Sequence, residues 1–251
     1  MKTIALLETR KLGRFMDHQR RLVANIEAAA ADFLAFHPEF QAAAAGQSLL
    51  ILIGSERGFC GDFNEAIMAA SAVIPEPRLV AVGRRLAGKL EGHPRLVAWL
   101  QGPNMAEETR PVLDELMNTL QRLRSETAPW TRLAVLAHDP DGVVASHAVL
   151  PLAPPEPPRH AYPPGLNLAP AEFFSGLTEH YLVAKLPDLF YGSLLAENRR
   201  RLEHMERALN RMQAKIEDLG RRRNALRQEE ITEEIEVILL SAESLLGEAG
   251  E

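Results

Sequence analysis

The sequence predicts an α/β fold in which an antiparallel coiled coil of the N- and C-terminal helices flanks a mostly parallel α/β domain. Heptad patterns of apolar residues occur at both ends of the chain, and apolar runs alternate with helical stretches between them. We therefore expect four parts: an N-terminal coiled-coil helix (1–47), the α/β domain (48–152), a proline-rich strap (153–180) and a long C-terminal coiled-coil helix (181–251).

The C-terminal helix is expected from a run between about Leu189 and Leu246 that contains no proline and almost no glycine. At about 1.5 Å per residue it would be on the order of 80–90 Å long, so its apolar stripe needs a partner beyond its own domain. The stripe follows a heptad seam over roughly four heptads: Leu202, Met205, Leu209, Met212, Ile216, Leu219 and Leu226.

The N-terminal helix is expected from about Thr3 to Phe36, where His37-Pro38 ends it because proline disfavours helix in the residue before it. Its seam contains one polar member, Gln19: Leu12, Phe15, Gln19, Leu22, Ile26, Ala29 and Phe33. The two terminal seams are expected to pair. The C-terminal helix is longer by about twenty residues, and its tip still carries an apolar stripe, so a partner protein should cover it: Ile231, Ile235, Ile238 and Leu239.

The middle of the chain alternates short apolar runs with amphipathic stretches, which predicts a Rossmann-like sheet with helices on both faces. The expected strands are 49–53, 79–83, 133–137 and 143–150, and the expected helices are 62–73, 84–90 and 107–126. The segment Pro151 to Pro170 then contains eight prolines and predicts extended chain.

Charge and composition narrow the function classes. The chain has 251 residues, a net charge of −6 and one cysteine, so it forms no internal disulfide and is not globally a nucleic-acid binder. We expect no signal peptide, because the first residues carry no long apolar core followed by small residues. We also expect no membrane span, since no run approaches about 18 apolar residues. Charge is graded along the C-terminal helix: residues 199–227 carry ten basic and four acidic residues, and eight glutamates but no basic residue follow.

A glycine-rich segment after the first strand carries a resemblance to a known family. Five of its residues match the signature Ser-Asp-x-Gly-Leu-Cys-Gly-x-x-Asn in order and spacing: Ser55, Gly58, Cys60, Gly61 and Asn64. The C-terminal helix supplies a second match without a gap: Glu197, Arg201-Leu202, Met205, Asn224, Arg227-Gln228, Ile231-Thr232 and Glu234-Ile235. With both motifs, the chain resembles the gamma subunit of F-type ATP synthases.

The sequence also departs from that family. Where the family's first helix carries Lys-Ile-Thr-x-Ala-Met, residues 21–26 here read Arg-Leu-Val-Ala-Asn-Ile. The chain is short for the family, with a trimmed middle domain and an unusual proline strap. In these respects it is similar to the alternative, ion-pumping branch of the F-type enzymes, the N-type ATPases.

The resemblance implies a central-stalk rotor without a catalytic, cofactor or metal site of its own. The implied partners are the ring of alpha and beta subunits, the epsilon subunit and the membrane c-ring, with one copy of this chain per complex. The implied location is peripheral, at the cytoplasmic face of the cell membrane. Carried over from the family, Arg227, Gln228 and Thr232 would contact an acidic loop of the beta subunits, with charge-assisted hydrogen bonds from Arg227.

Other functions were weighed for the same residues. Cys60 follows a strand in a glycine-rich turn, but no histidine stands at a recognisable catalytic spacing. The turn lacks the Lys-Ser/Thr of a phosphate-binding P-loop. His138 with Asp139 and Asp141 could bind a metal, although a turn explains these residues as well. The arginines at 221–223 lack the interleaved aromatics of a nucleic-acid site.

The main alternative to the rotor is a coiled-coil adaptor or structural interaction protein outside an ATPase. It predicts self-association through the C-terminal helix, whereas the rotor predicts an intrachain helix pair and a single copy in a larger complex.

Overall fold

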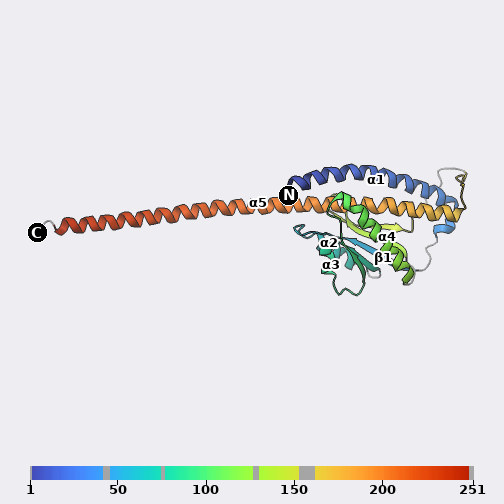
Figure 1. The fold of residues 1–251 in the computed structure, drawn as a ribbon, viewed down its shortest axis with the longest axis horizontal. Helices are drawn as coiled ribbons and strands as arrows, with labels where there is room; N and C mark the ends of the chain where they lie inside the picture. Colours follow the sequence, from blue (N-terminus) through green and yellow to red (C-terminus); the bar gives the residue numbers. More distant parts are fainter. Residues whose placement is uncertain (1, 42–45, 75–76, 127–129, 153–161, 249–251) are drawn as a thin grey trace. The chain divides into compact units, whose positions relative to one another are not determined.

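The computed structural model describes residues 2–41, 46–74, 77–126, 130–152 and 162–248 (Figure 1). The chain divides into two compact units, Met1–His204 (unit 1) and Met205–Glu251 (unit 2). Unit 1 contains all the described strands and every described helix except the C-terminal part of the last one. Among the described residues, no helix is both long enough and apolar enough to cross a bilayer.

The order of elements matches the expected alternation, with one strand more than predicted. The helices are α1 (Lys2–Phe36), α2 (Phe63–Ala72), α3 (Arg84–Lys89), α4 (Thr109–Glu126) and α5 (Pro170–Glu248), with short 3₁₀ helices η1 (Pro38–Gln41) and η2 (Ala106–Glu108). The strands are β1 (Gln47–Ile53), β2 (Arg78–Val82), β3 (Leu96–Leu100), β4 (Trp130–His138) and β5 (Val144–Leu150).

The strands form one five-stranded sheet in the order β3-β2-β1-β4-β5. β1 pairs parallel with β2 and β4, and β2 pairs parallel with β3, while β5 runs antiparallel to β4. The mostly parallel sheet expected from the sequence is therefore confirmed. Connections between parallel strands need a crossover, and α2 and α3 supply two of them.

Side chains of the central strand are buried on both faces of the sheet, which explains why its sequence is a continuous apolar run. Leu49, Ile51 and Ile53 pack with residues of α1, α4 and α5. Leu50 and Leu52 pack on the other face, with residues of α2 and α3. The helices thus enclose the sheet on both sides.

Within unit 1, α1 lies alongside the first part of α5 (Figure 1), so the expected pairing of the two ends of the chain is confirmed. The heptad phase of α1 was partly wrong: Phe15 and Leu22 are 44% and 43% exposed. The buried face is instead Leu12, Met16, Val23, Ala30, Phe33 and Leu34. Because α1 packs against the sheet core as well as α5, its buried face is rotated from that of a simple two-helix seam.

Gln19, the polar member of the α1 seam, contacts the backbone of α5 near its internal proline. Its side-chain amide donates to the carbonyl of Ala184 at 2.7 Å. Pro187 lies inside α5 and has no N–H to donate, and its ring disturbs the carbonyls of the preceding turn. The Gln19 amide therefore gives this turn a donor from the neighbouring helix. α5 continues through Pro187, which neither begins the helix nor ends it.

The expected boundary between strap and helix was too late. α5 begins at Pro170, not near residue 181, and the N–H of Phe173 bonds to the carbonyl of Ala169. Proline suits the first turn of a helix because the N–H that it lacks would have no partner there. Part of the predicted strap (153–161) lies outside the described residues, and residues 162–169 contain no helix or strand.

Most of the predicted C-terminal seam lies in unit 2 and is exposed there. Leu209, Met212, Ile216, Leu219 and Leu226 are all more than half exposed, and Met205 is partly buried, as is Leu202 in unit 1. The buried part of α5 lies earlier, from Tyr181 to Asn198. Within unit 1, α1 packs against Leu194 and Leu195 of α5, before the heptad run begins, and the pairing of the seam residues in unit 2 stays a prediction. Ile231, Ile235 and Ile238 are exposed as well; the side chain of Leu239 lies outside the described residues.

These exposures yield a first prediction, on stability. Phe33→Ala in the isolated chain should lower the free energy of unfolding by about 3–5 kcal/mol, because a large core ring is lost. Phe33 is 1% exposed and contacts the rings of Phe40, Phe173 and Phe174. Leu209→Asp should change that free energy by less than about 1 kcal/mol, since its cost is mainly helix propensity.

Guanidinium unfolding followed by circular dichroism measures both variants. A loss for Leu209→Asp as large as that for Phe33→Ala would mean that the seam of unit 2 is buried in the free chain.

Candidate functional site

The glycine-rich segment forms a closed turn between β1 and α2. The backbone N–H of Ser55 donates to Oδ1 of Asn64 at 2.9 Å, and Nδ2 of Asn64 donates to Oγ of Ser55 at 2.8 Å. Both side chains are buried. This reciprocal pair joins the end of the central strand to the first turn of α2, so Ser55 and Asn64 hold the turn in one conformation.

The glycines of the turn have different roles. Gly61 has φ +63°, a left-handed conformation that favours glycine. Gly58 has room for a side chain: an added Cβ would lie 3.5 Å from the guanidinium of Arg85. Close packing occurs at Gly54 instead. A Cβ there would lie 2.4 Å from Leu86 and 2.7 Å from Asn64.

Cys60 links the turn to α5 through a buried charged cluster, which we call the joint cluster: Cys60, Glu197, Asn198 and Arg201. The Cys60 thiol lies 3.7 Å from Oε1 of Glu197, and Nη2 of Arg201 lies 3.6 Å from the sulfur. Arg201 forms an ion pair with Glu197 one helical turn earlier and donates to Oδ1 of Asn198 at 2.7 Å. Residues about 140 positions apart in the chain thereby meet.

Burial changes the acidity of this cluster. It raises the pKa of Glu197 to about 7, although the ion pair with Arg201 acts in the opposite direction. Burial and the neighbouring Glu197 charge raise the pKa of the Cys60 thiol to about 11. At neutral pH the sulfur is therefore a protonated thiol, which is a weak nucleophile. The geometry favours a structural Cys60.

The point of the sheet where open α/β folds bind ligands is filled by the chain itself. Such sites lie at the carboxyl ends of the strands, where the strand order reverses, here between β1 and β4. Cys60 and Phe63 pack there against Ala196 of α5. A Cβ on Gly192 of α5 would lie 3.6 Å from Pro140. A helix of the same chain thus occupies the place of a nucleotide.

The histidine and aspartates after β4 form a turn. Nδ1 and Nε2 of His138 lie 3.0 and 2.9 Å from the carbonyls of Gly142 and Phe63, so both ring nitrogens already have partners. Oδ1 of Asp139 accepts from the N–H groups of Asp141 and Val143. Within the part of the chain that the structure describes, no group of three or more His, Cys, Asp or Glu could hold a metal.

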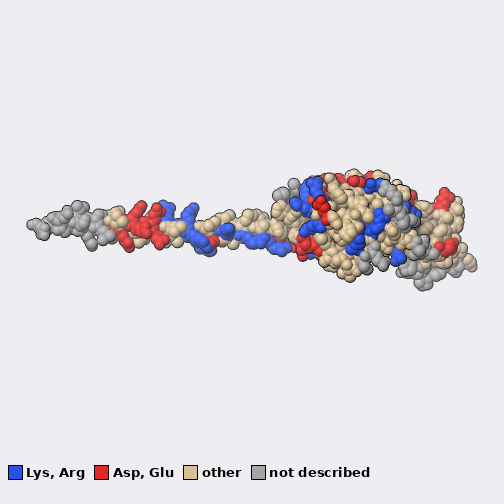
Figure 2. Space-filling model, turned by 90° about the horizontal axis from the view of Figure 1, so that it is seen from below, with Lys and Arg blue, Asp and Glu red and all other residues tan. Residues whose placement is uncertain are grey.

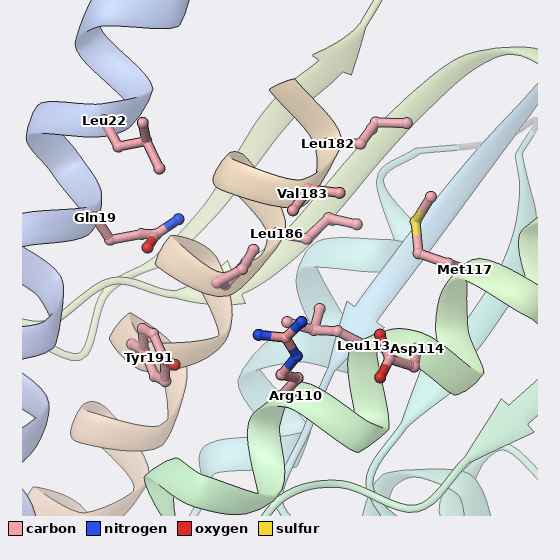
Figure 3. Close-up of a pocket in the computed structure, with 11 residues that line it drawn as sticks. Gln19, Leu22, Arg110, Leu113, Asp114, Met117, Leu182, Val183, Leu186 and Tyr191 are labelled. Atoms are coloured by element: carbon pink, nitrogen blue, oxygen red, sulfur yellow. The ribbon is translucent and has the colours of Figure 1, made fainter. Parts of the chain in front are cut away.

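A cavity of about 320 Å³ lies between α1, α4 and α5 (Figure 3). Its walls are mainly apolar, and its charged lining residues are Arg110 and Asp114, one turn apart on α4. Gln19 and Leu22 line it from α1, and Tyr191 lines it from α5. Among the described residues that line this cavity there is no cysteine, serine or histidine.

The residues expected to contact a partner lie together on α5 in unit 2. Arg227, Gln228 and Thr232 are all exposed. The Thr232 hydroxyl donates to the Gln228 carbonyl at 2.8 Å, so it offers a partner an acceptor. The arginines at 221 and 222 lie 3.5 and 3.1 Å from Asp218, and these ion pairs reduce their positive field.

Charge within unit 2 changes sign along the helix. Residues 205–227 contain seven Arg or Lys and three Asp or Glu, and residues 228–238 contain five Glu and no basic residue. Figure 2 shows this basic band followed by an acidic band. An exposed apolar stripe with flanking bands of opposite charge is suited to contact other proteins, not to perform chemistry.

The joint cluster yields a prediction on pH dependence. The pKa of Glu197 is raised to about 7 in the fold, above its ordinary value of 4.5. The folded state therefore holds more protons between these values, and the free energy of unfolding falls as pH rises from about 4.5 to about 7, by on the order of 2–3 kcal/mol. Glu197→Gln removes this titration and should flatten the profile over that range.

Denaturant unfolding at a series of pH values measures the profile of each variant. Glu179→Gln, a change at an exposed position of the same helix, is the matched control and should keep the parental slope. An unchanged slope in Glu197→Gln would show that the carboxyl of Glu197 does not titrate in this range.

Comparison with known proteins places this arrangement in a family. A family model described as ATP synthase matches residues 1–245. No curated protein matches the chain. Similar solved structures include a chain of the central stalk and c-ring of the Tetrahymena thermophila mitochondrial ATP synthase, with a TM-score of 0.60 and 14% identity. That match covers 83% of this chain and 97% of the other.

Two chains of the Euglena gracilis mitochondrial ATP synthase are also similar. One, from a structure of OSCP, F1 and the c-ring, has a TM-score of 0.61 and 12% identity, covering 100% of this chain and 96% of the other. One from the rotor has a TM-score of 0.55 and 12% identity, covering 92% and 98%. At these identities the likeness concerns the fold. Because the family model spans nearly the whole sequence, the chain belongs to the gamma-subunit family of ATP synthases.

Proposed function

We propose that the chain is the central-stalk rotor of a rotary F-type ATP synthase. It couples ion flow through a membrane c-ring to ATP synthesis or hydrolysis in a ring of alpha and beta subunits. The observation that carries this proposal is the family match over residues 1–245, which includes both terminal helices and the sheet between them. The similar solved chains come from assemblies described as central stalk, F1, c-ring and rotor.

The proposed role is mechanical, and the chain itself is not catalytic. A rotor transmits torque between a helical shaft and a body, so the two must not slip. The contacts of Cys60 with Glu197 and Arg201 tie the glycine-rich turn to α5, and the pair Ser55–Asn64 holds the turn itself in one conformation. These contacts are sensitive to geometry, because a shift of the turn would leave buried polar groups of α5 without their Cys60 partner. This favours one fixed orientation of the turn on the helix.

The proposed partners follow from the same role. One copy per complex would thread the alpha and beta ring, and the epsilon subunit would join it at the c-ring. The complex would work at the cytoplasmic face of the cell membrane, with this chain attached peripherally. The exposed stripe from Leu209 to Leu226 supports a partner for unit 2, because apolar stripes of this length are normally covered.

Arg227, Gln228 and Thr232 are proposed to contact an acidic loop of the beta subunits. Arg227 and Gln228 would donate hydrogen bonds, those from Arg227 being charge-assisted. Thr232 would accept, since its hydroxyl hydrogen bonds within the helix. An asymmetric shaft with such contacts makes three equivalent catalytic sites unequal, by binding their conformations with different affinity.

The test of the proposed function is purification of the tagged chain from its own membranes, with the mass and identity of each copurifying subunit. Alpha and beta subunits in a three-to-three ratio with one copy of this chain would support the rotor. A homodimer without ATPase subunits would support the coiled-coil adaptor and overturn the rotor.

The contact residues yield a prediction on coupling. In the assembled enzyme, Arg227→Ala with Gln228→Ala should reduce ion pumping per ATP hydrolysed roughly tenfold, the effect of losing about 1.4 kcal/mol of differential binding. ATP-driven pumping in membrane vesicles, divided by the ATPase rate, measures the coupling. Arg211→Ala with Gln213→Ala is the matched control on exposed positions of the same unit. Equal coupling in both variants would argue against the contact.

A further inference from the structure

The edge strand β3 forms a surface of unit 1 to which the proposed rotor function assigns no role. β3 is the last strand of the sheet on its side, and among the described residues no strand pairs with its outer edge. Its sequence, Leu-Val-Ala-Trp-Leu, contains no charge and no proline. Exposed edge strands are usually protected by charged residues, proline or bulges, because their free backbone groups invite another strand. Apart from an irregularity in its pairing with β2, β3 has none of these.

The backbone N–H and C=O groups of Trp99 lie on the outer edge of β3. Leu100 accepts a hydrogen bond from the N–H of Gly83, at the end of β2, and therefore faces the sheet. Successive residues of a strand point their backbone groups to opposite sides, so Trp99 directs its N–H and C=O away from β2. The Trp99 side chain is 53% exposed. A strand on this edge would pair with the Trp99 backbone.

A shallow cavity lies beside this edge, between α3 and β3. We call it the β3 dish; its volume is about 340 Å³, and Gly88, Gly92, Leu96 and Trp99 are among its lining residues. A Cβ added at Gly88 or Gly92 would meet nothing within 4 Å, so these glycines leave the dish open. Tryptophan beside an open apolar recess is the residue type most enriched in the energetic centres of protein interfaces.

We propose that β3 is a docking site for an extended segment of another subunit of the same complex. The segment would add a sixth strand to the five-stranded sheet. One of its side chains would enter the β3 dish beside Trp99. Main-chain hydrogen bonds supply affinity in such strand addition, and the recess supplies specificity. The charged lining residues, Arg84 and Glu91, have opposite signs, so the dish selects an apolar or aromatic side chain.

The occupant is a different subunit, because a second copy of this chain would be held too weakly. Five paired residues and one recess would bury far less surface than the roughly 1,200–2,000 Å² that a stable free dimer buries. A subunit already held in the complex by other contacts binds such a small edge at high effective concentration. The inference therefore rests on the proposed rotor function, which supplies the complex.

Hydrogen–deuterium exchange of the assembled complex and of the isolated chain tests the proposal. The peptide that contains Trp99 should exchange at least about tenfold more slowly in the complex. Gly88→Gln fills the dish without changing charge. In the complex of this variant, the Trp99 peptide should exchange about tenfold faster than in the parental complex. Gly176→Gln is the matched control, because a Cβ there also meets nothing within 4 Å and the residue lies in a helix.

Each outcome has a distinct meaning. Equal exchange in the complex and the free chain, with alpha and beta subunits present, would overturn the docking site and leave the rotor intact. Protection in the free chain that rises with concentration, together with a dimer mass, would overturn the choice of partner. A purified chain without any ATPase subunit would overturn the rotor, and the proposal with it. Slow exchange of the Trp99 peptide in the complexes of the parent and of Gly176→Gln, but not in the complex of Gly88→Gln, would support the docking site.

Discussion

The packing of α5 across the sheet is the interaction on which the rest of unit 1 depends. Leu182, Leu186 and Phe190 of this helix enter the same core cluster as Phe33 of α1 and the central strand β1. A little further along, Ala196 packs on the glycine-rich turn and Glu197 contacts Cys60. One helix therefore supplies core for the sheet, a partner for α1 and a wall for the turn.

This packing fills the point between β1 and β4, which is one place where an open sheet can bind a ligand. Open parallel sheets bind nucleotides at the carboxyl ends of the strands where the strand order reverses. Here Phe63 stacks on His138 with ring centroids 3.8 Å apart, and Cys60 and Ala196 complete a small buried cluster. The fold that elsewhere holds a cofactor here holds a helix, which suits a mechanical subunit.

The attachment of helix to turn is polar as well as apolar. The pair Glu197–Arg201 is almost fully buried beside the Cys60 thiol, and Ser55 and Asn64 close the turn behind it. Apolar contacts alone tolerate sliding, because the hydrophobic effect has no direction. The contacts of Cys60 with Glu197 and Arg201 join the turn to the helix, and directional contacts of this kind are lost when the turn shifts. The combination favours one orientation of the body on its helix.

Much of the secondary structure could be read from the sequence, because the signals are local. The runs at 49–53, 79–83 and 133–137 predicted the three inner strands, and the heptads predicted both terminal helices. The strand β3 was missed, although Leu96 to Leu100 is an apolar run placed between Pro94 and Gly102. It is only five residues long, and periodicity cannot distinguish a strand from a buried helical turn in so short an apolar run.

By itself, the sequence determined the α/β class, the two terminal helices and the residues of the glycine-rich turn. Only the tertiary structure decided that Met16 and Val23, not Phe15 and Leu22, face the core, and that Glu197 and Arg201 meet Cys60. It also decided that the seam after Met205 is exposed in the free chain. Periodicity reports that a helix has an apolar face, but the neighbours that bury it come from distant parts of the chain.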